Sequence, residues 1–441
     1  MNHEEYRKKT LAAFSGAEEE IAAYVAPNIE KYRKGTVKLR LTEKNGKPIA
    51  GKRVHIAQQT HDFKYGANIF LLDEFPDGER NLRYRDAFAD YFNLATVPFY
   101  WSELEPTEGA LRFAANSPKI YRRPAPDLCL NYCREKEIDA KLHCLFYDKF
   151  IPDWLPRGNE SEMLRLYEKR FCEIAERYGN RQLYEIEVSN EVLENYGWKT
   201  KSVLSDRRDT PLWAWQMAKQ YFPNDRLVIN ETNKLTEVAQ HTYRSSYFLM
   251  LENLFKDGAR IDKIGVQHHI FIGASGTQEE ELPKFLPMLD PKAIIKGLQI
   301  LSTFGKPLEI TEVTIPTLDG DEWLQAELLR HMYEIWFATP QMASVIYWNT
   351  ADGTAYTGDA NWNENNVCAG LFHPDMTPKP AAEMLKHLFG EVWHTELDLE
   401  TDASGCADFR GFYGDYEAKV GEKTARFGLH QDAKKITDLT I

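Results

Sequence analysis

The chain has little of what would assign it at once to a membrane, metal-binding or nucleic-acid-binding class. No apolar run approaches the length of a membrane span, so we expect no membrane partner. The 441 residues include only six cysteines, without the paired spacing of a zinc site or a disulfide scaffold, which predicts reduced thiols and no metal. Lys and Arg number 54 against 67 Asp and Glu, for a formal net charge of -13. Because phosphate binding needs a basic surface, we expect no nucleic-acid partner.

Two further absences concern export and nucleotide cofactors. The first residues begin no apolar run of the length that a signal peptide needs, so we expect a cytoplasmic protein, or a secreted one whose signal was removed. No Gly-rich phosphate loop follows an early predicted strand, which argues against a dinucleotide-binding sheet, and we expect no cofactor. The sequence predicts no particular oligomeric state.

The order of the predicted elements favours an α/β fold with a large barrel. Residues 3–33 show helical periodicity, which predicts an N-terminal helical segment over 1–35. Over 62–390 strands alternate with helices, and eight such units predict a closed (β/α)8 TIM barrel, with a doubly wound open sheet as the alternative. The eight strands are expected near residues 65–70, 92–97, 139–145, 184–189, 226–230, 262–267, 307–311 and 344–348.

The segments on either side of the barrel have a different pattern, that of half-buried strands. Residues 37–41 and 52–57 alternate apolar with polar side chains around Asn45-Gly46, which predicts a β-hairpin within 36–61. The alternation returns in residues 391–441. Because a unit of about fifty residues buries little surface by itself, we expect the hairpin and this tail to form one small β-sandwich with the barrel inserted between them.

Two glutamates stand at the ends of predicted buried strands, where α/β barrels place catalytic groups. Glu191 follows the strand at 184–189, and Glu312 follows the strand at 307–311. A single acid in such a place is more often a solvated loop residue. Strands four and seven end at the same rim, however, so the two carboxyl groups are expected to lie close together. Retaining glycosidases need such a pair about 5–5.5 Å apart, one as nucleophile and one as acid and base.

Several motifs near these strand ends follow one another in a definite order. They are Trp101 with Glu105-Pro106 and Gly109, His143 with Pro152-Asp153-Trp154, Val188-Ser189-Asn190-Glu191, Gly265-Val266-Gln267-His268-His269, Ile310-Thr311-Glu312, and Ile346-Tyr347-Trp348 with Asp352. In this order, over roughly residues 65–390, the chain resembles glycoside hydrolase family 10, the xylanase family. The Asn190-Glu191 motif is similar to the family's acid/base motif, and Thr311-Glu312 is similar to its nucleophile motif.

The resemblance implies a barrel enzyme that hydrolyses β-1,4-xylosidic or related bonds by double displacement, with a carbohydrate as its partner. Glu312 would be the nucleophile and Glu191 the acid/base. Asn190 would donate to the sugar 2-hydroxyl. His268 is expected to be structural, because the family pattern includes only its neighbour His269, and the pair is expected to bind no metal, because adjacent strand residues point to opposite faces. The implied substrate-binding residues are His143, Tyr147, Asn190, Gln267, His269, Trp348 and Trp362.

The chain departs from the family pattern where the family holds the sugar on the non-reducing side of the cut. The family's Glu-Asn-x-x-Lys is replaced by Thr96-Val97-Pro98-Phe99-Tyr100, its Trp-His by Tyr147-Asp148, and its Gln before Pro-x-Trp by Phe150-Ile151. Each lost hydrogen bond to a sugar hydroxyl removes on the order of 1–3 kcal/mol of discrimination. We therefore expect short or decorated substrates.

Three alternatives stay open. The chain is a conventional endo-β-1,4-xylanase whose missing contacts come from inserted loops at 118–126 and 354–361, a non-catalytic carbohydrate-binding barrel, or a metal-dependent barrel hydrolase. In the first inserted loop, Arg122 and Arg123 are candidates for binding a uronic acid, although exposed loop arginines are mostly solvated.

Overall fold

The computed structural model contains a closed barrel of parallel strands. It describes residues 1–198, 200–358, 361–431 and 436–441. The strands run in the order β10-β3-β4-β5-β6-β7-β8-β9 around the barrel. Each overlaps one of the eight predicted strands, which confirms the (β/α)8 prediction. Their bounds are β3 (Lys64–Asn68), β4 (Leu94–Pro98), β5 (Asp139–His143), β6 (Glu185–Asn190), β7 (Leu227–Glu231), β8 (Lys263–His269), β9 (Leu308–Thr314) and β10 (Met342–Tyr347).

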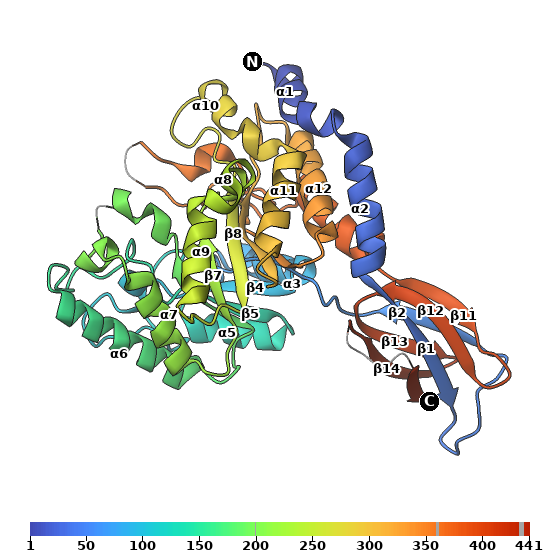
Figure 1. Cartoon of the computed structure of the whole chain (residues 1–441). Coiled ribbons are helices and arrows are strands. Elements are labelled where there is room, and N and C mark those ends of the chain that lie inside the picture. Colours follow the sequence, from blue (N-terminus) through green and yellow to red (C-terminus); the bar gives the residue numbers. More distant parts are fainter. Residues whose placement is uncertain (199, 359–360, 432–435) are drawn as a thin grey trace. The chain divides into compact units, whose positions relative to one another are not determined.

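Helices between the barrel strands cover the outside of the barrel (Figure 1). In α6 (Glu160–Tyr178), the Asn159 side chain caps the first turn, Tyr167, Phe171 and Ile174 are buried, and Gly179 stands directly after the last turn, as the sequence pattern predicts. The others are α3 (Gly78–Tyr91), α4 (Trp101–Leu104), α5 (Pro126–Glu135), α7 (Thr210–Tyr221), α8 (Leu235–His241), α9 (Ser246–Lys256), α10 (Gln278–Phe285), α11 (Pro291–Ser302), α12 (Glu322–Ala338) and α13 (Pro380–His387), with shorter turns η1 (Val192–Gly197), η2 (Val203–Asp206), η3 (Thr242–Arg244), η4 (Leu286–Leu289), η5 (Glu364–Val367) and η6 (Leu388–Val392).

The barrel interior contains paired charges below the rim. Lys263 Nζ lies 2.5 Å from Glu185 Oε2, and Lys141 lies 3.2 Å from Glu187 and also binds Glu309. All five side chains are buried. Because a buried charge is tolerated only when it is paired, these contacts fix the register of β5, β6, β8 and β9 relative to one another.

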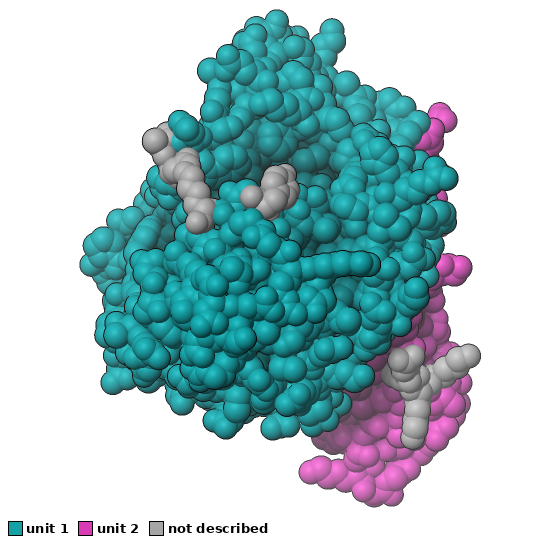
Figure 2. All heavy atoms as spheres, turned by 60° about the vertical axis from the view of Figure 1, so that its left-hand side comes forward, with its two compact units in different colours: residues 1–17, 65–328, 341–382 teal, residues 18–64, 329–340, 383–441 magenta. Residues whose placement is uncertain are grey.

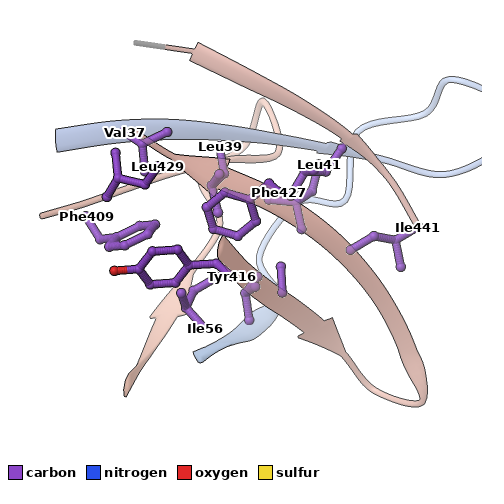
Figure 3. Close-up of a cluster of buried hydrophobic side chains, with 12 residues drawn as sticks. Val37, Leu39, Leu41, Ile56, Phe409, Tyr416, Phe427, Leu429 and Ile441 are labelled. Carbon is purple, nitrogen blue, oxygen red and sulfur yellow. The ribbon is translucent and has the colours of Figure 1, made fainter. Parts of the chain in front are cut away.

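The second group of strands forms two sheets that face each other across an apolar core. One sheet has the order β12-β1-β15 and the other β11-β2-β13-β14. In Figure 3 the rings of Phe409, Tyr416 and Phe427 gather between the strands with Leu39 and Ile56. Since both ends of the sequence contribute, the predicted β-sandwich is confirmed. The strands are β1 (Lys34–Thr42), β2 (Arg53–Gln58), β11 (Glu396–Glu400), β12 (Cys406–Phe412), β13 (Gly414–Val420), β14 (Lys423–Leu429) and β15 (Ile436–Thr440).

The predicted β-hairpin is wrong, because β1 and β2 belong to different sheets. Strand β1 pairs with β12 and β15, whereas β2 pairs with β11 and β13. A turn does form at Asn45-Gly46, with Gly46 at a φ of 83°, but the connection carries the chain from one sheet to the other. Each strand buries one apolar face, and facing each other across the core satisfies both faces better than pairing side by side.

The chain divides into two compact units, and each contains one of the N-terminal helices (Figure 2). Unit 1 comprises residues 1–17, 65–328 and 341–382, and unit 2 comprises residues 18–64, 329–340 and 383–441. The helical segment predicted as one piece is two helices, α1 (His3–Ser15) and α2 (Glu18–Tyr32), separated at Gly16, a residue with low helix propensity. No helix in the described residues is long and apolar enough to cross a membrane.

Candidate active site

A cleft of about 950 Å³ lies at the rim where the barrel strands end. The strands are parallel, so their carboxyl ends meet at this one rim, and side chains from several strands converge there. All nine residues that the sequence singled out line the same cleft: His143, Tyr147, Asn190, Glu191, Gln267, His269, Glu312, Trp348 and Trp362.

The two glutamates are connected by the amide of Gln267. Its Nε2 donates to Glu191 Oε1 and to Glu312 Oε1, at 3.0 Å in each case. The two acceptor oxygens are therefore no more than about 6 Å apart, twice that distance. Strand β8 lies beside β9, so the amide reaches Glu312 from the neighbouring strand, and it reaches Glu191 past the end of β7, which lies between β8 and β6.

Glu312 is held from three sides. Asn230 Nδ2 donates to its Oε1 at 2.8 Å, in addition to Gln267, and His269 Nε2 lies 3.0 Å from its Oε2. Three donors orient both oxygens and favour the ionised form. Burial, together with repulsion from Glu191, nevertheless raises the pKa of Glu312 to about 8. The charge of Glu312 therefore depends on its burial and on the charge of Glu191.

His269 supplies a neutral donor to this carboxylate. Burial lowers the pKa of His269 to about 4, so the ring carries one proton at neutral pH. Its Nδ1 lies 2.7 Å from the Thr314 hydroxyl. With Thr314 donating to Nδ1, the single proton is on Nε2, where it is donated to Glu312. The histidine thus orients the carboxylate without adding a formal charge.

Glu191 is fixed by its backbone and by a tyrosine. Its φ is 52°, in the left-handed region that non-glycine residues rarely adopt, and its N–H donates to the Asn230 carbonyl at 3.0 Å. The hydroxyl of Tyr147, from the loop after β5, donates to Glu191 Oε2 at 2.6 Å. Both Glu191 oxygens are thus bonded, one to Gln267 and one to Tyr147.

His143 is bonded at both ring nitrogens by other side chains. Its Nδ1 lies 2.8 Å from Glu187 Oε1, and its Nε2 lies 2.9 Å from the hydroxyl of Tyr100. Although burial opposes a charge on the ring, the Glu187 carboxylate raises the pKa of His143. Tyr100 therefore occupies the position from which His143 was expected to donate to a sugar hydroxyl, and that role of His143 stays a prediction.

The aromatic and amide residues of the prediction lie around these acids. Trp348 is buried at the end of β10, 5.3 Å from the Phe70 ring and 5.4 Å from the His143 ring. Trp362 packs against Phe271, 5.2 Å away, farther along the cleft. The Oδ1 of Asn190 lies 3.4 Å from Gln267 Nε2, which turns the Asn190 amide toward the two glutamates.

Sequence reasoning missed two residues that organise the site, Asn230 and Glu187. Asn230 donates to both Glu312 and Glu187, and Thr311 Oγ1 donates to Asn230 Oδ1 at 2.5 Å. Asn230-Glu231 ends a predicted buried strand in the same way as Asn190-Glu191, and this repeated pattern is the signal that could have found it. Glu187 lies inside a strand and carries no comparable signal.

The two arginines of the first inserted loop are not solvated, so the expectation of exposed arginines is wrong. Arg122 is buried and binds the Thr354 carbonyl, and the Arg123 side chain is 11% exposed and lies 4.2 Å from the Tyr100 ring. Both line the cleft. In the second inserted loop, residues 359 and 360 lie outside the described residues.

One group of potential metal ligands lies near the site in the described part of the chain. It consists of His143, Cys144 and Glu187, whose ligand atoms lie within 4.8 Å of one another. Glu187 also pairs with the Lys141 ammonium at 3.2 Å, and His143 Nδ1 faces Glu187 directly. Because a neighbouring ammonium repels a cation, these residues do not fit a metal ion. The Glu187 carboxylate instead holds the His143 ring in place.

Comparison with known proteins identifies relatives of the chain. Anti-sigma-I factor RsgI6 of Acetivibrio thermocellus is 23% identical over 399 residues, which cover 89% of this chain and 45% of that protein. Endo-1,4-beta-xylanase 2 of Arabidopsis thaliana is 22% identical over 413 residues, covering 92% of this chain and 34% of that protein. The chain thus spans less than half the length of these curated relatives.

Solved structures share the barrel fold. Xylanase 10B from Thermotoga maritima has a TM-score of 0.58 and 18% identity, covering 75% of this chain and 96% of that chain. Xylanase 10B from Thermotoga petrophila, in complex with xylobiose, gives the same TM-score. Residues 74–388 match the model of glycosyl hydrolase family 10, in agreement with the resemblance of the motifs. Since this match covers more than half of the sequence, the chain belongs to glycosyl hydrolase family 10.

Proposed function

We propose that the chain is a retaining β-glycoside hydrolase that cleaves β-1,4-xylosidic or closely related bonds in plant-type oligo- or polysaccharides. The observation that carries the proposal is the Gln267 amide between Glu191 and Glu312, which keeps their nearest oxygens within about 6 Å. Retaining enzymes use a separation of about 5–5.5 Å, whereas inverting enzymes need about 6.5–9.5 Å to admit a water molecule. The xylanases among the relatives support the choice of sugar.

In the first step Glu312 attacks the anomeric carbon as the bond to the leaving oxygen breaks, and Glu191 gives its proton to that oxygen. The product is a glycosyl ester on Glu312. In the second step water attacks the same carbon, Glu191 takes a proton from the water, and the Glu312 carboxylate is released. Asn230 and His269 keep the attacking oxygens oriented in both steps.

Short or decorated oligosaccharides are the substrates that this site favours. The family's polar positions at the second barrel strand hold Thr96, Val97 and Tyr100 here, and the Tyr100 hydroxyl is already bonded to His143. Fewer groups are then free to bind sugars on the non-reducing side. A conventional endo-β-1,4-xylanase is the alternative within the same chemistry.

A non-catalytic carbohydrate-binding barrel is a second candidate function. The observation in its favour is that a relative covering 89% of this chain is named an anti-sigma factor rather than an enzyme. The presence of both carboxylates in bonded positions argues for catalysis, because a binding surface has no need to keep two buried acids so close together.

The test is hydrolysis of 4-nitrophenyl β-xyloside with the first sugar product followed by NMR. We expect β-xylose to form before mutarotation, and Glu312→Ala to lose on the order of 10,000-fold or more in kcat. The exposed Glu108 provides the matched control, Glu108→Ala, which should retain activity. Initial formation of α-xylose would contradict retention, and full activity of Glu312→Ala would overturn its role. Binding of xylo-oligosaccharides without any hydrolysis would favour the binding barrel.

A further inference from the structure

The end of the cleft toward β10 is built differently from the rest. Glu191 follows β6, and in the barrel order β10 is four strands away in either direction, so it is the strand opposite β6. Glu191 protonates the leaving oxygen, which places the leaving group on the β6 side. The sugar that Glu312 attacks therefore extends toward β10 and the two strands that follow it in the barrel order, β3 and β4.

Arg122 joins two loops at that far end. It comes from the loop after β4 and donates to the Thr354 carbonyl and, at 3.3 Å, to Asn349 Oδ1, both in the loop after β10. Asn349 Nδ2 in turn donates to Glu364 Oε2 at 3.1 Å. Arg122 is 6% exposed and Asn349 is 4% exposed. These bonds close the space between the two loops with buried, paired groups.

Arg123, the next residue, lines the cleft beside the bonds that Arg122 makes. Its guanidinium lies 4.2 Å from the centre of the Tyr100 ring and 5.7 Å from that of Phe150, and its Nε lies 3.7 Å from Glu103. The Tyr100 and Phe150 rings are 4.7 Å apart. A cation stacked on aromatic faces and paired with an acid holds its position.

The loop after β5 closes the same end from a third direction. Phe150 meets Tyr356, of the loop after β10, edge to face at 6.0 Å. On the leaving-group side, by contrast, the residues lining the cleft belong to the loops after β6, β7 and β8 and include Trp198, Thr232, Asn233 and Phe271. On the side of Trp348, side-chain contacts instead join the loops after β4, β5 and β10 to one another.

We propose that these residues form a glycone wall, which leaves room for one sugar on the non-reducing side of the cut, so that the enzyme removes single sugars from the non-reducing end of its substrate. The inference rests on the proposed function. A second sugar on that side would need the volume that the wall side chains fill. The wall consists of Tyr100, Arg122, Arg123, Phe150 and Tyr356, which line the cleft, together with Thr354, whose carbonyl accepts from Arg122.

The experiment uses the full chain and xylotetraose reduced at its reducing end, so that each product shows from which end it was cut. The wall predicts xylose and xylotriitol as first products, with xylose exceeding free xylobiose by at least about tenfold. Early release of xylobiose or xylotriose would overturn the wall while leaving the proposed function standing. Absence of hydrolysis both of this substrate and of 4-nitrophenyl β-xyloside would overturn the proposed function and the wall with it.

Arg123→Ala tests the wall itself, because Arg123 touches the cleft without holding the two loops together. We expect free xylobiose to rise about tenfold relative to xylose. The matched control is Lys119→Ala, which removes the same charge from an exposed position of the same loop. Circular dichroism and hydrolysis of the aryl xyloside verify that each variant is folded. An unchanged product ratio in an active Arg123→Ala would contradict the assignment of Arg123 to the wall.

Discussion

The hydroxyl of Tyr147 donates a 2.6 Å hydrogen bond to Glu191 Oε2, the oxygen that Gln267 does not contact. Tyr147 stands where the family pattern has a tryptophan, whose indole N–H would approach from a different point. Its phenol is buried, and burial raises its pKa well above the ordinary value, so it remains a proton donor over the whole working pH range. The tyrosine thus holds Glu191, the proposed acid/base, by a contact that the family motif does not describe.

Tyr147→Phe removes this bond and keeps the ring. We expect a loss of about tenfold or more in kcat for xylobiose, whose leaving group needs the proton, and a much smaller loss for 2,4-dinitrophenyl β-xyloside, whose leaving group does not. Steady-state kinetics on the two substrates give the comparison. Equal losses on both would show that Tyr147 serves packing rather than proton transfer.

Glu312 gives a pH dependence with a definite sign. Burial and the nearby Glu191 raise the pKa of Glu312 to about 8, so the attacking carboxylate is lost as the pH falls below that value. Glu191→Gln removes the repelling charge, and the acid limb of kcat/KM for 2,4-dinitrophenyl β-xyloside should then move to lower pH. Glu108→Gln changes the same charge at an exposed site and should leave the limb in place. A limb that stays unmoved in Glu191→Gln would contradict the coupling.

The sandwich core depends on side chains from both ends of the sequence. Leu39 on β1 is fully buried among Val37, Phe427 and their neighbours. Leu39→Ala should lower the free energy of unfolding by about 2–5 kcal/mol, measured by urea denaturation. Lys38→Ala, on the opposite face of the same strand, should change it by about 0.5 kcal/mol or less. Similar values for the two variants would mean that the alternation of β1 does not define the core.

The parts of the fold that depend on local pattern could be predicted from the sequence. The barrel strands alternate with helices along the sequence, and this order predicts the barrel even though β8 and β9, which are buried along their whole length, contain polar residues such as Gln267 and Glu312. Alternation identified β1 and β2 as strands but not their partners. Pairing was decided by strands more than 350 residues away, such as β12 and β13, and no local feature specifies such contacts.

In the candidate site, too, the features set by local sequence could be predicted, and the contacts between distant segments could not. Residues at strand ends, such as Glu191, Gln267 and Glu312, could be placed together because parallel strands share a rim. The contact of Tyr100 with His143, and that of Tyr147 with Glu191, depend on loop conformations that composition and spacing do not determine. For the same reason Arg122 and Arg123 were expected in solvent, whereas bonds to the loop after β10 bury Arg122, and Arg123 packs against the rings of Tyr100 and Phe150.

The covalent intermediate on Glu312 is the most direct test of the proposed mechanism. A 2,4-dinitrophenyl 2-deoxy-2-fluoro-β-xyloside should transfer its sugar to the enzyme faster than water removes it, because the fluorine slows both steps and the good leaving group restores the first. Mass spectrometry of the intact protein should show one fluoroxylosyl group added, and peptide analysis should locate it on Glu312. Attachment to any other residue, or full turnover with no adduct and formation of an α-sugar, would contradict the mechanism.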